Sequence, residues 1–135
     1  MKFEDLEVYK ISMELSDKVW TIVEKWDFFK KDTIGKQLVR AVDSVSANIS
    51  EGFGRNTFRD QRCFYYYSRG SLYESKTWII KAYRRNIIDQ KTYYELLAAF
   101  NLLGVKLNNF ITSTTKLMNE ARQQEANNQD KNISQ

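Results

Sequence analysis

Residues 40–55 read RAVDSVSANISEGFGR, and this stretch indicates how the chain folds. Counted at 100° per residue, its apolar side chains and the leucine just before it fall on one face of a helix. That face holds Leu38, Val42, Val45, Ile49 and Phe53. A polar row lies roughly 140° further around the helix. It holds Arg40, Ser44, Asn48, Glu51 and Arg55. Because exposed helices usually carry Lys and Glu instead, the stretch predicts a core helix with a specialised polar side.

Composition favours long, uninterrupted helices in a single domain. The chain has 135 residues, no proline and only five glycines, and 42% of its residues are hydrophobic. Proline is the main breaker of helices, and 135 residues suffice for one core. The composition therefore favours an all-α domain.

Periodic apolar residues predict four helices. Their expected ranges are 5–26, 32–54, 57–86 and 89–122. Thr57, followed by Asp60, is expected to cap the third helix, and Asp89 the fourth. The glycines at 52 and 54 are expected to end the second helix by adopting left-handed backbone. Short links between such helices predict an antiparallel up-down-up-down four-helix bundle over residues 1–122. The polar residues 123–135 are expected to be a disordered or fraying tail.

The third helix is expected to have two distinct sides. Its core side is predicted to hold Phe64, Ser68, Ser71, Leu72, Ser75, Ile79 and Ala82. Its opposite side carries a basic and aromatic row at three- and four-residue steps, made of Arg59, Arg62, Tyr66, Arg69, Tyr73 and Lys76. Residues 30–85 carry 12 basic and 5 acidic side chains, a net charge of +7, whereas residues 1–29 carry 4 basic and 7 acidic ones.

Arginine and tyrosine on one face can hold phosphates and stack on bases, so the row predicts a nucleic-acid-binding basic patch. Lys36, Arg40 and Arg55 are expected to add charge to it. The row is also compatible with a solvated face, or with an intersubunit face that pairs with the acidic first helix. That first helix carries two adjoining apolar stripes, which suit either a wide core face or contact with a partner subunit.

The residue inventory argues against catalysis. The chain has no histidine, which removes the commonest general base and metal ligand. Glu51, Glu74 and Asp43 could act as acids or bases, but no nucleophile or metal-ligand cluster accompanies them. The glycine-rich EGFGR follows a helix, whereas phosphate-binding loops follow a strand. We expect no enzymatic activity, cofactor, metal or small-molecule substrate.

Location is also indicated by the sequence. The single cysteine, Cys63, fits a reducing compartment. The N-terminus has no apolar signal region, and no apolar run reaches the roughly 20 residues of a membrane span. We expect a cytoplasmic protein without membrane contact.

Three motifs resemble one known family over about residues 3–120. They are FEDLEVYK at residues 3–10, QLVRAVDSVSANISEGFGR at 37–55 and RGSLYESKT at 69–77. They are similar to motifs of the four-helix-bundle family whose founding members are encoded in intervening sequences of bacterial 23S rRNA genes. The resemblance implies a homo-oligomer, typically a pentamer, without established enzymatic activity. It also implies kinship with basic, pentameric nucleic-acid-binding accessory proteins.

Two functions remain open at this point. One is an oligomeric accessory protein that binds structured RNA, ribosomal RNA or DNA through the basic row. The other is a scaffolding oligomer that binds no nucleic acid. In the second, the polar row of residues 40–55 acts with Glu74 as a structural seam that sets the register of subunits. We call Arg40, Ser44, Asn48, Glu51, Arg55 and Glu74 the polar seam; it could face a subunit interface, a lumen or solvent.

Overall fold

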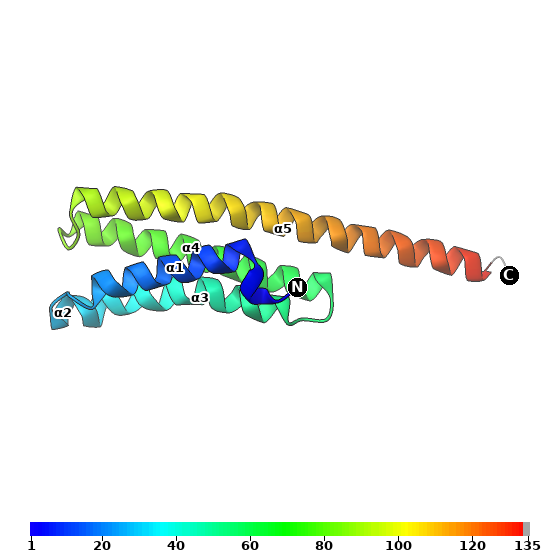
Figure 1. The fold of residues 1–135 in the computed structure, drawn as a ribbon, viewed down its shortest axis with the longest axis horizontal. Coiled ribbons are helices and arrows are strands. Elements are labelled where there is room, and N and C mark those ends of the chain that lie inside the picture. The colour runs from blue at the N-terminus through cyan, green and yellow to red at the C-terminus, as the bar shows by residue number, and fades with distance from the viewer. Residues whose placement is uncertain (134–135) are drawn as a thin grey trace.

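The computed structural model describes residues 1–133, which form four long helices and no strand (Figure 1). The elements in chain order are the 3-10 turn η1 (Phe3–Asp5), α1 (Glu7–Val23), the short α2 (Phe28–Lys30), the π-helical η2 (Lys31–Gly35), α3 (Lys36–Phe53), α4 (Phe58–Arg84) and α5 (Gln90–Ile133). The expected all-α class and helical bundle are confirmed. None of the helices in residues 1–133 combines the length and apolar content of a membrane span.

Side-chain caps set where the helices begin. The Thr57 hydroxyl accepts a hydrogen bond from the Asp60 backbone N–H at 3.1 Å, and Asp89 accepts one from Thr92 at 2.8 Å. Both were predicted as caps. The carboxylate of Asp27 also accepts from the Lys30 N–H, at 3.1 Å. The side chain and backbone N–H of Thr92 lower the pKa of Asp89, and the backbone N–H of Lys30 lowers that of Asp27, because hydrogen bonds favour the ionised carboxylates.

The cap at Asp27 corrects the predicted start of the second helix. Helical backbone begins at Phe28, earlier than expected, and passes through the π-helical turn of η2 into α3 without a break. The first helix is shorter than predicted, since α1 ends at Val23 and Trp26 packs on the core from the turn that follows.

The end of α3 also differs from the prediction. Gly54 follows it with a φ of −78°, so no left-handed glycine ends this helix. The requirement for glycine lies at Gly52, where α3 meets α4 closely. A Cβ atom at this position would lie 2.7 Å from Cε1 of Tyr65.

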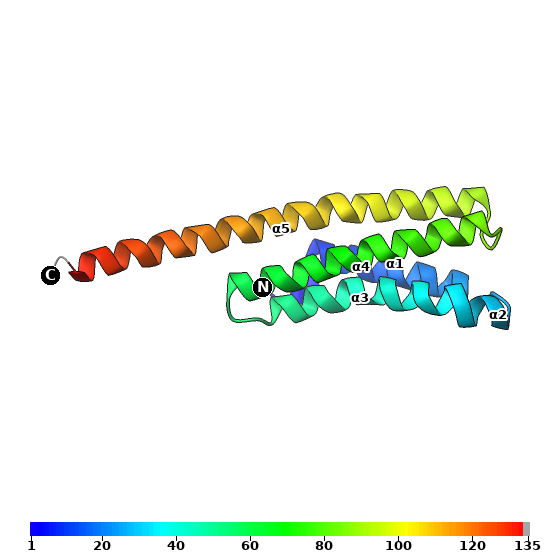
Figure 2. The same cartoon turned by 180° about the vertical axis from the view of Figure 1, so that it is seen from behind.

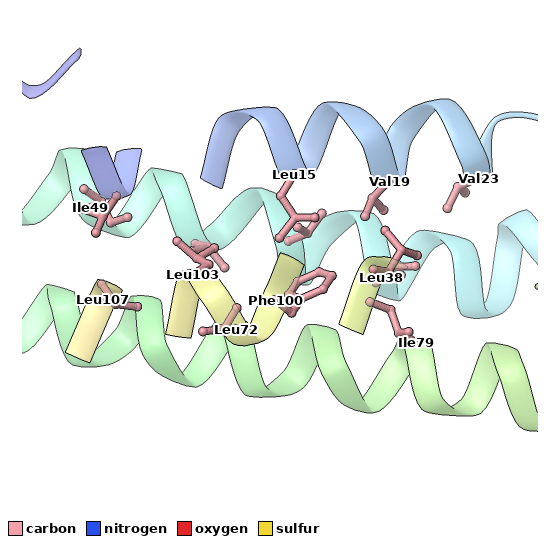
Figure 3. Packing of buried hydrophobic residues seen from close by; sticks show 14 of the residues in the cluster. Leu15, Val19, Val23, Leu38, Ile49, Leu72, Ile79, Phe100, Leu103 and Leu107 are labelled. Carbon is pink, nitrogen blue, oxygen red and sulfur yellow. The ribbon is translucent and has the colours of Figure 1, made fainter. Parts of the chain in front are cut away.

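The core runs along the axis of the bundle (Figure 3). Four members of the predicted apolar face of α3 are buried, namely Leu38, Val42, Val45 and Ile49, whereas Phe53 at the helix end is half-buried. On α4, Tyr65 is buried with 1% of its surface exposed, and the predicted Phe64 is only half-buried. Burial raises the pKa of Tyr65 to about 12. The serine side of α4 is confirmed at Ser68 and Ser75.

The helices occupy the corners of a quadrilateral. α3 packs against α1 and α4, and α5 packs against α4 and α1 (Figure 2). The α1/α3 edge and the α4/α5 edge are therefore on opposite sides of the bundle. The link between α4 and α5 turns at Asn86, whose φ of 59° is a conformation that asparagine tolerates.

Helix α5 is much longer than predicted. It continues past Arg122 to Ile133 and projects beyond the other helices (Figure 1). Residues 123–133 are helical, where a disordered or fraying tail was expected; Ser134 and Gln135 lie outside the described residues. The side chains from 122 to 133 are all exposed. The helix therefore continues over these residues without packing against the bundle.

Candidate nucleic-acid interface

The basic and aromatic row of α4 lies beside α5. Since α4 runs unbroken from Phe58 to Arg84, residues three and four apart share one face. Arg62, Arg69 and Lys76 are half-buried against the neighbouring helix, whereas Arg59, Tyr66 and Tyr73 are exposed. The predicted row therefore lies on one face of α4, and its cations differ in how much of each side chain is buried.

Tyr66 holds two arginines of this row. The Cζ atom of Arg62 lies 5.1 Å from the centre of the Tyr66 ring, and that of Arg69 lies 4.7 Å from it. Arg62 also donates from Nη2 to the Tyr66 hydroxyl at 3.2 Å, and Arg69 donates from Nη1 to Oδ1 of Asn108 at 3.3 Å. We call Arg62, Tyr66 and Arg69 the Tyr66 cluster. In this cluster both guanidinium groups are held by uncharged partners, the Tyr66 side chain and the Asn108 amide.

A groove between α4 and α5 contains this cluster. Its larger part has a volume of about 790 Å³, and its smaller part, about 280 Å³, adjoins it through Arg69 and Asn108. The larger part is lined by Arg62, Tyr66, Arg69, Asn108, Ile111, Thr112, Thr115, Lys116, Asn119, Glu120 and Gln123. The smaller part is lined by Arg69, Leu72, Tyr73, Lys76, Phe100, Asn101, Gly104, Val105 and Asn108. We call both parts together the α4/α5 groove.

The cations of this groove lack acidic partners. The salt bridges within residues 1–133 are Lys18–Glu95, Lys30–Asp27, Arg55–Glu51 and Lys106–Glu7. None of them involves Arg62, Arg69, Lys76 or Lys116, and Glu120 is the one acidic side chain lining the groove in the described chain. The Nε atom of Arg62 is moreover buried without a hydrogen-bond partner among the described residues. Uncompensated guanidinium groups in a groove favour an anionic ligand.

Sequence reasoning missed the α5 wall of the groove. Asn101, Asn108, Thr112, Thr115 and Asn119 recur along α5 at helical spacing, as the residues of α4 do. That spacing was a usable signal. The polar row was overlooked because the apolar stripe of the same helix dominated the interpretation.

Lys36 and Arg40 lie elsewhere. They line a groove of about 480 Å³ on the α1/α3 edge, together with Trp20, Val23, Glu24, Lys31, Gly35 and Val39. The structure does not bring these two residues to the Tyr66 cluster, because α3 turns this face away from α5. Arg55 is separate again: it is exposed near the α3–α4 turn, 2.6 Å from Glu51 and 4.5 Å from the Phe64 ring centre.

Most hydrogen bonds of the polar seam lie within one helix, whereas Arg55, in the turn after α3, accepts one at its carbonyl from Nε2 of Gln61 on α4 at 3.0 Å. Ser44 donates to the Arg40 carbonyl and Asn48 to the Ser44 carbonyl, both at 2.8 Å. Glu74 accepts a hydrogen bond from Nε1 of Trp78 on its own helix at 3.4 Å. The bond that does link α3 to α4 comes from Ser68, whose buried hydroxyl donates to the Val45 carbonyl at 2.7 Å.

Comparison with known proteins gives a family and a fold. Residues 4–109 match the sequence model of a family described as 23S rRNA-intervening sequence protein. A crystal structure of a protein of unknown function from the S23 ribosomal protein family of Bacteroides thetaiotaomicron has a similar fold, with a TM-score of 0.70. It is 18% identical in sequence, and the alignment covers 77% of this chain and 97% of that one. No curated protein matched the chain.

Proposed function

The chain belongs to the family of 23S rRNA-intervening sequence proteins, and on that premise we propose that it is a non-enzymatic accessory protein that binds RNA or DNA. The observation that carries the proposal is the Tyr66 cluster, which fixes two guanidinium groups without an acidic partner in the α4/α5 groove. Two adjacent arginines can bind the phosphodiester groups of a nucleic-acid backbone. Contacts to these phosphates contribute affinity with little sequence preference.

Binding through phosphates makes salt dependence the test. Fluorescence anisotropy with a structured RNA and a DNA duplex at several salt concentrations should show affinity falling steeply as salt rises. Replacing Arg62 and Arg69 by alanine should reduce the slope of log K against log salt by about 2, one for each lost phosphate contact.

The double variant Lys36→Ala/Arg40→Ala is the matched control, since it removes the same charge from the opposite edge. It should leave the salt slope nearly unchanged. Absence of binding at low salt would refute the proposal, and an equal loss in both double variants would refute its placement in the α4/α5 groove.

We also propose that the protein forms a homo-oligomer. Each subunit would be an antiparallel up-down-up-down bundle, and the assembly would be a pentamer. The α1/α3 edge supports self-association, because Trp20 is 58% exposed beside the apolar groove there and Met13 is exposed on the same helix. Large exposed apolar side chains rimmed by charges mark interaction surfaces.

This edge also supports the second candidate function, a scaffolding oligomer without nucleic-acid binding. Light scattering tests whether this edge is a subunit contact: Trp20→Glu should lower the oligomer mass, whereas Arg62→Ala, in the α4/α5 groove, should not. Wild-type mass in the Trp20 variant would refute the assignment of this edge to subunit contact.

A further inference from the structure

We propose that the α4/α5 groove binds single-stranded nucleic acid in preference to a duplex, an inference that rests on the proposed function. The juxtaposition that carries it is a fixed pair of arginines at one part of the groove and an exposed tyrosine facing amide side chains at the other. The two parts join at Arg69 and Asn108, so one strand can follow both.

The shape of the groove suits one strand. It lies between two adjacent helices, whose axes are typically about 8–10 Å apart, and extends from Arg62 to Lys76, about 21 Å along α4. Proteins that read a duplex usually insert a helix into the nucleic acid instead: a helix about 10–12 Å in diameter enters a major groove about 12 Å wide. A duplex could therefore reach only the rim of this groove.

The Tyr66 cluster is the phosphate site of the proposal. Both guanidinium groups already lie over the Tyr66 ring, so that ring is engaged with cations and cannot serve as a stacking surface without displacing one of them. Tyr66 is a positioning residue. It holds Arg62 and Arg69 in place, and the unpartnered Nε of Arg62 supplies a further donor once the side chain shifts toward a phosphate.

Tyr73 is the stacking residue. Its side chain is 57% exposed and lines the smaller part of the groove together with Val105 of α5, which is 59% exposed. Among the described residues, the Tyr73 ring has one cation near it, Nζ of Lys76 at 5.7 Å from the ring centre, whereas Tyr66 is 36% exposed and has two guanidinium groups closer to its ring. An aromatic ring in a cationic groove is the usual platform for an unstacked base, whatever its identity.

Amide side chains provide contacts to base edges. Asn101 and Asn108 line the smaller part of the groove beside Tyr73, and Asn119 lines the larger part. An amide offers both a donor and an acceptor, which matches the exposed edges of unpaired bases. In a duplex the base faces are stacked and the pairing edges are used, so Tyr73 and these amides would lose their partners. The difference between single strand and duplex therefore depends on Tyr73.

The test compares fluorescently labelled oligo(U) and oligo(dT) of about 12 nucleotides, within the usual range of site sizes, with a duplex of the same length at low salt. The single strands should bind at least about tenfold more tightly than the duplex, because stacking on one aromatic ring contributes about that factor. Tyr73→Leu should remove this advantage and leave duplex binding unchanged.

Tyr67→Leu is the matched control. Tyr67 lies on the same helix, is 59% exposed and does not line the groove, so its loss should change neither affinity. Comparing oligo(U) with oligo(dT) shows whether the groove prefers RNA or DNA. Tighter binding of either strand than of the duplex supports the inference.

Two outcomes separate this inference from the proposed function. Duplex binding as tight as single-strand binding, or an equal effect of the Tyr67 and Tyr73 variants, would overturn the inference and leave nucleic-acid binding standing. Failure of every probe to bind at low salt would overturn both.

Discussion

At the scale of single residues, a buried hydroxyl provides a hydrogen bond between α3 and α4. Ser68 on α4 donates to the backbone carbonyl of Val45 on α3, and its surface is fully buried. Ser12, Ser16 and Ser75 donate instead to carbonyls of their own helices. Small polar side chains thus let the helices approach closely while their hydroxyl groups stay satisfied, as buried polar groups require.

Ser68→Ala should destabilise the protein by roughly 1 kcal/mol, because it removes a buried hydrogen bond between helices. Thermal unfolding followed by circular dichroism measures the change. Ser71→Ala is the control, since Ser71 is half-buried on the same helix and its hydroxyl makes no hydrogen bond within residues 1–133. Equal melting temperatures for the two variants would show that the Ser68 bond contributes nothing.

Asp43 is expected to make the stability of the protein depend on pH. Although the Asp43 side chain is exposed, desolvation by the surrounding protein and the nearby Asp17 raise its pKa, so the folded state favours the protonated carboxyl more than the unfolded state does. The associated stability is present below the ordinary pKa and is lost as the pH rises through the raised value. At pH 7 the ionised Asp43 therefore opposes folding.

Asp43→Asn should raise the melting temperature at pH 7, by the equivalent of less than about 1 kcal/mol because solvent screens the pair. The gain should vanish below the ordinary pKa of 3.8, where the parent carboxyl is protonated as well. Melting curves at pH 7 and at pH 3 test both points. A variant less stable than its parent at pH 7 would contradict the assigned sign.

At the scale of elements, α3 and α4 cross where Gly52 leaves room for the other backbone. A Cβ atom there would lie 2.7 Å from Tyr65 Cε1, 2.9 Å from Phe64 Cβ and 3.0 Å from the carbonyl oxygen of Gln61. The last two atoms belong to α4 itself or are rigidly attached to it, so they cannot give way. Gly70, in contrast, has no atom within 4 Å of its added Cβ.

These two glycines should respond to alanine with opposite signs. Gly52→Ala should destabilise the protein by roughly 1–3 kcal/mol through overpacking. Gly70→Ala should stabilise it by roughly 0.5–1 kcal/mol, because the helix then loses less backbone entropy on folding. Chemical denaturation measures both. A stabilising Gly52→Ala would mean that α3 and α4 are less closely packed than the geometry requires.

At the scale of the whole molecule, the two edges of the bundle have different characters. The α4/α5 edge carries a polar, cationic groove, and the α1/α3 edge carries an apolar one with the exposed Trp20. Helix α5, at 44 residues, extends well past the first of these edges and is exposed over its last turns. The extension begins where the groove ends, since Gln123 still lines the larger part of the groove.

A chain ending at Arg122 should melt at nearly the same temperature as the full chain, because residues 123–133 bury nothing. Its molar helical signal should fall by the amount that these residues contribute. Circular dichroism measures both quantities on the same samples. A clear drop in melting temperature would show that the extension packs against another subunit.

The fold class was predictable because helical periodicity and the absence of proline are local properties. The faces of α3 and α4, the caps at Thr57 and Asp89 and the serine side of α4 all depend on neighbours within a few residues. The row from Arg59 to Lys76 was predictable for the same reason, as one helix alone sets its spacing. The unbroken helix through η2 and the persistence of α5 to Ile133 were missed, since turn residues and polar composition were interpreted as breaks.

The sequence by itself determined which residues share a helix face, and the family through three motifs. Only the tertiary structure decided which faces meet. It separated Lys36 and Arg40 from the Tyr66 cluster, replaced Phe64 by Tyr65 in the core and brought Asn108 of α5 to Arg69 of α4. The physical reason is that a period of 3.6 residues fixes angles within one helix, whereas the rotation of one helix against another depends on how all four pack.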